Sequence, residues 1–191
     1  MASLDPKEIL LVMALAEESQ GLFENAGLQP LYTGIGSVKS TYSLTRAVYN
    51  LKPKAILNLG TAGSFQLPQG KTVECSAFVQ RHIAKKTVPS KKIITSHYLT
   101  DLPKAICGTA DFIEHSVASV KSVASEQNFY DIMDMEGYAL AFVAQQSHIP
   151  FHAVKFVSDN SGQDVFSNWK SNLPAAAKNL LQVYKEITER F

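Results

Sequence analysis

The sequence predicts an α/β protein in which helices pack on a largely buried sheet. Residues 8–15 (EILLVMAL) and 55–60 (AILNLG) are near-continuous apolar runs of strand length, a pattern typical of strands buried on both faces. Between these runs, residues 16–27 and 38–51 have helical character. With a short strand between the helices, the order strand, helix, strand, helix, strand indicates an α/β sheet.

In the first half of the chain, capping and turn residues mark the ends of the helices. Glu17 and Glu18 fall in the first turn of the first helix, where acidic side chains favour the helix dipole, and Gly27 is placed to end it. Ser37 is a suitable N-cap for the second helix. The glycines of Gly60–Gly63 predict a turn after the third strand. The elements expected here are strands at residues 8–15, 28–34 and 55–60 and helices at residues 16–27 and 38–51.

The second half begins less regularly and then returns to alternating strands and helices. We expect a loop over residues 85–104 and an amphipathic terminal helix that starts at Pro174. We find no internal repeat, low-complexity segment or linker, so we expect one domain over residues 1–191. The elements expected here are strands at residues 71–84, 92–95, 105–109, 129–135 and 151–159 and helices at residues 115–127, 136–148 and 174–191.

Composition and charge are those of an ordinary globular protein. The formal net charge is +1, which does not indicate nucleic acid or an anionic membrane as a partner. No apolar run reaches the roughly 20 residues of a membrane span. Acidic Asp5 and Glu8 precede the first apolar run, so we interpret that run as a buried strand rather than a signal peptide. Cys75 and Cys107 lack metal-site spacing, which favours reduced thiols and a cytoplasmic location.

Acidic residues gather where strands of residues 132–163 end. Asp134 and Glu136 lie where a strand passes into a helix, and Asp159 ends the next strand. Ligands of open α/β sheets bind at the carboxyl ends of the strands, the edge that Glu18 also reaches. Any one of these acids alone is as well explained by a solvated loop or a helix dipole. Together they predict recognition of a polar ligand combined with acid–base chemistry.

Lys155 lies within an otherwise apolar strand, so its charge must be paired or must line a cavity. A role in the site and a structural ion pair both fit this position. The glycine turns at residues 34–36 and 60–63 have neither dinucleotide-binding nor P-loop spacing, so tight turns explain them at least equally well. His148 and His152 flank Pro150 and therefore do not share a helix face, which argues against a zinc hydrolase. The absence of a Gly-x-Ser-x-Gly motif argues against a serine hydrolase.

Three segments resemble the purine nucleoside phosphorylase/nucleosidase superfamily: LGTAG (residues 59–63), DMEGYALA (134–141) and VKFVSD (154–159). The resemblance extends over about residues 8–185, and the branch it is most similar to is 5'-methylthioadenosine/S-adenosylhomocysteine nucleosidase. It implies a three-layer α/β/α sandwich around a mixed sheet. It also implies a homodimer that needs neither a metal nor an organic cofactor.

The resemblance also implies roles for the residues that match the family's motifs. Asp159, with Ser158 beside it, would contact the purine N7 and protonate the leaving base. Glu136 would accept hydrogen bonds from the ribose hydroxyls, and Met135 would pack under the sugar. These roles agree with the carboxylates expected at the strand ends.

The remaining roles fall on the first helix and on two loops. Glu18 would be the general base on the attacking water, and Phe112 would stack on the base while the backbone of Ile113 reads its edge. Cleavage of an N-glycosidic bond needs an acid for the base and a base for the water. The Gly-flanked segment would add substrate contacts through Thr61, Ala62 and Gly63.

Two features bear on the choice of nucleophile. The loop after the first strand, MALAEES, is acidic where phosphorylases hold phosphate, so water is favoured over phosphate. Lys155 stands where nucleosidases carry an arginine, and it would hold the water or the Glu18 carboxylate. The substrate then expected is a purine nucleoside such as methylthioadenosine or adenosylhomocysteine. Futalosine hydrolase, a nucleoside phosphorylase and a non-catalytic nucleoside-binding protein are the alternatives.

Overall fold

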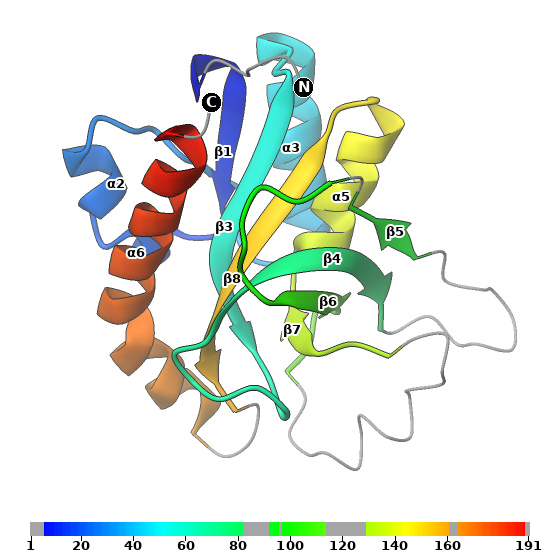
Figure 1. The fold of residues 1–191 in the computed structure, drawn as a ribbon. Coiled ribbons are helices and arrows are strands. Elements are labelled where there is room, and N and C mark those ends of the chain that lie inside the picture. The colour runs from blue at the N-terminus through cyan, green and yellow to red at the C-terminus, as the bar shows by residue number, and fades with distance from the viewer. Residues whose placement is uncertain (1–5, 82–91, 96, 114–128, 161–163, 190–191) are drawn as a thin grey trace, which may run out of the picture.

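The computed structural model describes residues 6–81, 92–95, 97–113, 129–160 and 164–189, which form a mixed sheet with helices on both faces (Figure 1). This arrangement confirms the predicted α/β/α sandwich. The helices are a 3-10 turn η1 (Pro6–Glu8), α1 (Ala16–Ser19), α2 (Leu22–Asn25), α3 (Ser37–Leu51), α5 (Gly137–Gln146) and α6 (Val165–Glu189). The strands are β1 (Ile9–Met13), β2 (Leu31–Tyr32), β3 (Ala55–Gly63), β4 (Thr72–Gln80), β5 (Ile93–Ile94), β6 (Lys104–Thr109), β7 (Ile132–Asp134) and β8 (Phe151–Asp159).

The sheet combines parallel and antiparallel neighbours. The described strands follow the order β2-β1-β3-β7-β6-β4-β5, and β8 pairs with both β3 and β4. The neighbours of β3 differ in direction, because β1 and β8 run parallel to it while β7 runs antiparallel. Since β8 joins β3 to β4, the strands β3, β8, β4, β6 and β7 close into a ring. The long parallel pair of β3 and β8 brings the ends of these two strands together at one edge.

Alternate residues of the central strands fill the two layers between sheet and helices. In β1, Leu11 and Met13 point to the side covered by α6, whereas Val12 packs on the side of α3 and α5. The same alternation in β3 places Ile56 toward α3 and α5 and Leu57 toward α6. A strand buried on both faces has this near-continuous apolar sequence. The alternation therefore explains why the predicted strands were recognisable.

Two expectations for the first half of the chain are wrong. The predicted helix at residues 16–27 is divided into α1 and α2, because Gln20 (φ 49°) and Gly21 (φ 71°) adopt left-handed conformations that a right-handed helix cannot include. The predicted turn at Gly60–Gly63 is part of β3, which continues to Gly63. There the strand keeps its pairing with β8, with a register shift between Ala62 and Gly63. At Gly60 the strand passes close to the side chains of Glu18 and Lys155, where a Cβ would be crowded.

The terminal helix begins earlier than expected. α6 starts at Val165, and Pro174, which marked the predicted start, lies inside it. Proline lacks the N–H that would bond to the carbonyl of Lys170, so packing must offset this loss. Leu173 and Ala176, on either side of the proline, are buried. The predicted helix at residues 115–127 lies outside the described residues. Within the described ranges, no helix combines the length and the apolar character that crossing a membrane requires.

Candidate functional site

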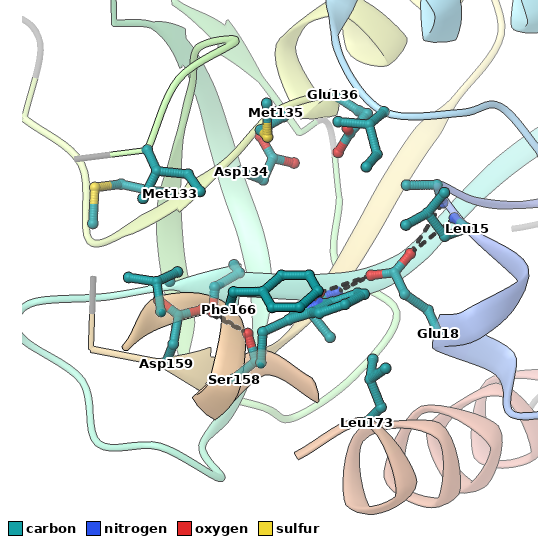
Figure 2. A pocket seen from close by; sticks show the side chains of 18 of the residues that line it. Leu15, Glu18, Met133, Asp134, Met135, Glu136, Ser158, Asp159, Phe166 and Leu173 are labelled. Atoms are coloured by element: carbon teal, nitrogen blue, oxygen red, sulfur yellow. Dashed lines mark hydrogen bonds between the residues drawn. The ribbon is translucent and has the colours of Figure 1, made fainter. Parts of the chain in front are cut away.

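A cavity of about 650 Å³ lies at the carboxyl ends of β3, β6, β7 and β8, and the loop that follows β1 lines it as well. Figure 2 shows Glu18 and Asp159 on opposite sides of the view, with Met135 and Glu136 along another wall. All of the predicted site residues except Lys155 line this cavity. They are Glu18, Thr61, Ala62, Gly63, Phe112, Ile113, Met135, Glu136, Ser158 and Asp159.

The Glu18 carboxylate is buried and surrounded by donors. Its Oε1 accepts hydrogen bonds from the backbone N–H and the hydroxyl of Thr61, both at 2.8 Å. Its Oε2 accepts the N–H groups of Ala14 and Leu15 at 3.2 and 3.3 Å. These four hydrogen bonds fix the orientation of the carboxylate at the cavity wall. The arrangement depends on Gly60, because a Cβ there would lie 3.2 Å from Glu18 Oε1.

Asp159 enters the cavity from the end of β8. Its Oδ2 accepts a hydrogen bond from the Ser158 hydroxyl at 2.8 Å, and both residues are buried. The Asp159 backbone carbonyl accepts the N–H of Ser64 at 3.0 Å, which ties the strand end to the end of β3. The aspartate is therefore held in place while its side chain faces the cavity.

Glu136 lies at the start of α5 in a different environment. It is 7% exposed, and its Oε1 accepts the N–H of Gly36 at 2.8 Å. Burial, followed by the nearby Asp134 carboxylate, raises the pKa of Glu136 to about 8, with a smaller contribution from Glu18. Groups that donate hydrogen bonds to the carboxylate would lower this pKa again. A ligand that brings hydroxyl groups to Glu136 would therefore form favourable hydrogen bonds with its carboxylate.

The ammonium group of Lys155 pairs with Asp134 behind this wall. Its Nζ lies 3.0 Å from Asp134 Oδ2, and both side chains are almost fully buried. Burial opposes both charges, yet their attraction lowers the pKa of Asp134 and raises that of Lys155 above its ordinary value. Asp134 also accepts the Thr109 hydroxyl at 2.6 Å and the N–H of Gly137 at 2.9 Å. Of the two roles left open for Lys155, the geometry supplies the ion pair.

The loop that carries Phe112 is anchored on two sides. Asp111 accepts the N–H and the hydroxyl of Ser37, at the start of α3, at 2.8 and 2.9 Å. The Arg81 guanidinium donates to the Phe112 carbonyl at 3.2 Å and lies 5.1 Å from the Phe112 ring centroid. The same guanidinium group also lies over the Tyr130 ring, 5.6 Å from its centroid. Phe112 and Ile113 are half exposed and border the cavity.

Several residues that line the cavity were not predicted from the sequence. Arg81 is 4% exposed and belongs to a segment interpreted only as strand. Phe166, Trp169 and Leu173 come from the first turns of α6, which the sequence analysis left outside the terminal helix. Trp169 donates its indole N–H to the Thr61 hydroxyl oxygen at 3.0 Å. Its being the chain's sole tryptophan is the signal that could have drawn attention to this segment.

The chain is similar to proteins of known class. A curated relative is the 5'-methylthioadenosine/S-adenosylhomocysteine nucleosidase of Lysinibacillus sphaericus, 25% identical over 199 residues, which cover 90% of this chain and 85% of that protein. A crystal structure of a putative nucleosidase of the same name from Francisella philomiragia has a TM-score of 0.85 at 20% identity, covering 96% of this chain and 99% of that one.

A futalosine hydrolase mutant from Helicobacter pylori has a TM-score of 0.84 at 20% identity, covering 96% of this chain and 99% of that one. At these identities the structural likenesses concern the fold. The family model of the phosphorylase superfamily matches residues 30–189, which include most of the strands and the cavity-lining residues from Ile35 to Leu173, but not Glu18. The chain therefore belongs to the phosphorylase superfamily.

Proposed function

We propose that the protein hydrolyses the N-glycosidic bond of an adenine nucleoside such as 5'-methylthioadenosine or S-adenosylhomocysteine. The observation that carries the proposal is the delivery of two buried carboxyl groups, Glu18 and Asp159, to one cavity from different elements. The cavity volume of about 650 Å³ is in the range of small-molecule sites, about 300–1,000 Å³. The curated relative named above carries the same activity in its name.

In the proposed reaction, Asp159 supplies the proton and Glu18 receives one. Protonation of the base at N7 makes it a leaving group, and its bond to the ribose breaks with the electron pair passing to the base. The sugar then carries oxocarbenium character. Water forms the new bond to the ribose carbon and gives its proton to Glu18, whose hydrogen bonds hold the carboxylate in place beforehand.

The rest of the cavity would hold the nucleoside in register with these two groups. Glu136 would accept the ribose hydroxyls, and Met135 would pack against the sugar. Phe112 would stack on the base, with the backbone of Ile113 at its edge. Ser158, which donates to Asp159, would orient the acid. Lys155 would act indirectly, by neutralising Asp134, which lies beside Glu136 in the cavity wall.

Water is favoured over phosphate because of the charges at the end of β1. Glu18 lies there with its carboxylate facing the cavity, and an incoming phosphate would be repelled by it. Lys155 is engaged with Asp134 rather than directed into the cavity. Arg81 does line the cavity, but two of its N–H groups donate to the carbonyls of Gly108 and Phe112.

The test is the release of adenine from methylthioadenosine and adenosylhomocysteine, with and without phosphate, alongside base release from futalosine. We expect adenine release that does not depend on phosphate. A requirement for phosphate would replace the hydrolase with a phosphorylase, and a preference for futalosine would replace the substrate. Nucleoside binding without turnover of any of them would indicate a binding protein.

Asp159→Asn gives the matching test of the acid. The amide keeps the shape of the side chain but has no proton of suitable acidity to donate, so we expect turnover to be abolished while the fold and substrate binding persist. Circular dichroism and binding of methylthioadenosine check the fold and the site. A near-normal rate in this variant would remove Asp159 from the proposed role.

We also propose that the protein is a cytoplasmic homodimer. Val38, Tyr42 and Tyr49 are exposed on α3 with helical spacing, and such an apolar stripe favours a partner surface. Cys75 and Cys107 are buried thiols that form no disulfide, as is usual for a reducing compartment. Sedimentation of wild type and of Tyr42→Arg tests the dimer. A monomeric wild type contradicts it, and cell fractionation tests the location.

A further inference from the structure

A hydrogen-bonded chain runs from α6 through β3 to Glu18. The indole N–H of Trp169 lies 3.0 Å from Thr61 Oγ1, and the same oxygen lies 2.8 Å from Glu18 Oε1. Figure 2 shows Glu18 reaching toward the side chains that lie beside Phe166, the neighbour of Trp169 on α6. α6 thus touches the carboxylate through a single intermediate hydroxyl group.

The chemistry of the donors sets the direction of this chain. An indole nitrogen only donates, so Thr61 Oγ1 accepts the bond from Trp169. A threonine hydroxyl has one proton, and with its oxygen engaged in this way that proton is directed to Glu18 Oε1. The bond from Trp169 therefore reinforces the rotation of the Thr61 hydroxyl in which its proton is directed to Glu18.

Among the donors to Glu18, this hydroxyl is the one that can turn away. The others are backbone N–H groups of Ala14, Leu15 and Thr61, whose directions are set by the main chain. Trp169 is itself held by the Phe166 ring, whose centroid lies 5.6 Å away. The Thr61 hydroxyl, the donor to Glu18 that is free to rotate, is thus held by the Trp169 side chain of α6.

We propose that Trp169 is a positioning residue that fixes the Thr61 hydroxyl on Glu18 and so orients the carboxylate toward the attacking water. The catalytic part of this proposal rests on the proposed hydrolase function. Because Trp169 also lines the cavity, the geometry of Glu18 depends on how the first turns of α6 are placed. Trp169 therefore contributes a polar function in addition to its apolar surface.

Trp169→Phe tests the proposal by removing the N–H while keeping an aromatic ring. We expect kcat to fall about fivefold, the change that corresponds to one net hydrogen bond of about 1 kcal/mol, with KM little altered. Thr61→Val breaks the same chain and keeps the backbone N–H that Glu18 also uses. In the Thr61→Val background, Trp169→Phe should then have little further effect on kcat. Independent, multiplying effects on kcat, or a rise in KM with kcat unchanged, would overturn the proposal.

A second measurement needs no turnover. Trp169 is the single tryptophan of the chain, so tryptophan fluorescence reports the surroundings of this indole alone, including its hydrogen bond. We expect the emission of the wild type to shift in Thr61→Val, which removes the acceptor, and to stay unchanged in Glu186→Gln, an exposed control near the far end of α6. A shift in a protein that lacks hydrolase activity would retain the hydrogen-bonded chain and reject its catalytic role. Emission that is identical in wild type and Thr61→Val would overturn the chain itself.

Discussion

Two glutamates of the same cavity have opposite surroundings. Glu18 accepts backbone and hydroxyl donors on both of its carboxylate oxygens. Glu136 accepts the N–H of Gly36 on one oxygen and lies near Asp134, and burial raises its pKa to about 8. Both side chains are almost fully buried, so burial alone does not distinguish them.

The difference teaches that the protein itself supplies hydrogen-bond donors to both oxygens of the Glu18 carboxylate. For Glu136 it supplies the N–H of Gly36, and a ligand would have to supply the further donors. Backbone N–H groups around Glu18 are in place before any ligand arrives, which suits a group that must be ionised to accept a proton. Glu136 lacks comparable donors among the described residues, and the ribose hydroxyls of a bound nucleoside would supply them. The first glutamate is arranged for chemistry and the second for recognition.

The largest expected effect follows from removing the first carboxylate. Glu18→Gln cannot accept a proton from water, so we expect kcat to fall by roughly 10²- to 10⁴-fold, the usual contribution of a general base. Steady-state rates and substrate binding measured together would show lost turnover with retained binding. Glu186→Gln, an exposed change on α6, is the control. Similar losses in kcat and in binding would show that Glu18 is needed for recognition instead, which would erase its contrast with Glu136.

The ion pair behind Glu136 gives the next effect. Lys155→Met leaves the Asp134 charge buried without its partner, so we expect a loss of about 3–5 kcal/mol in the free energy of unfolding. Urea unfolding at neutral pH measures it. The matched control is Lys54→Met, which breaks the exposed Lys54–Glu8 pair of 2.9 Å and should leave the free energy of unfolding nearly unchanged, because water screens the two charges. Equal losses in the two variants would mean that the buried pair does not support the Glu136 wall.

The most gradual effect, a slope with pH, concerns Glu136. The native side chain keeps its proton up to a pH of about 8, whereas an unfolded glutamate loses it near 4.5. Between these values the unfolded state binds fewer protons, so the wild-type free energy of unfolding falls as pH rises, by at most about 1.4 kcal/mol per pH unit.

Glu136→Gln cannot titrate and should not show this decline. Its stability relative to wild type therefore increases from pH 4.5 to about 8 and is constant outside this window. Urea unfolding of both proteins from pH 4 to 9 measures the difference. Parallel pH profiles of the two proteins would mean that Glu136 is ionised at neutral pH without a ligand. That result would contradict the proposed difference between Glu136 and Glu18.

Much of the fold and much of the cavity wall follow from local sequence. The apolar runs at residues 8–15 and 151–159 predict strands because both faces of these strands are buried. Asp159 is the last residue of such a strand and therefore lies at the carboxyl edge of the sheet. The proposed chemistry of Glu18 and Glu136 was assigned from the family resemblance, and it stays a prediction that the variants above test.

The sequence by itself determined most of the strands, the helices at residues 38–51 and 136–148 and the edge at which the acids gather, because hydrophobic periodicity and chain direction are local properties. Tertiary structure alone decided which charges meet. Lys155 faces Asp134 because β8, β3 and β7 are neighbours through long-range pairing. Trp169 reaches Thr61 because packing carries α6 through Pro174, a residue that local rules place at the start of a helix. Partners distant in the chain are set by the sheet order and by the packing of α6, and neither is encoded in a short segment.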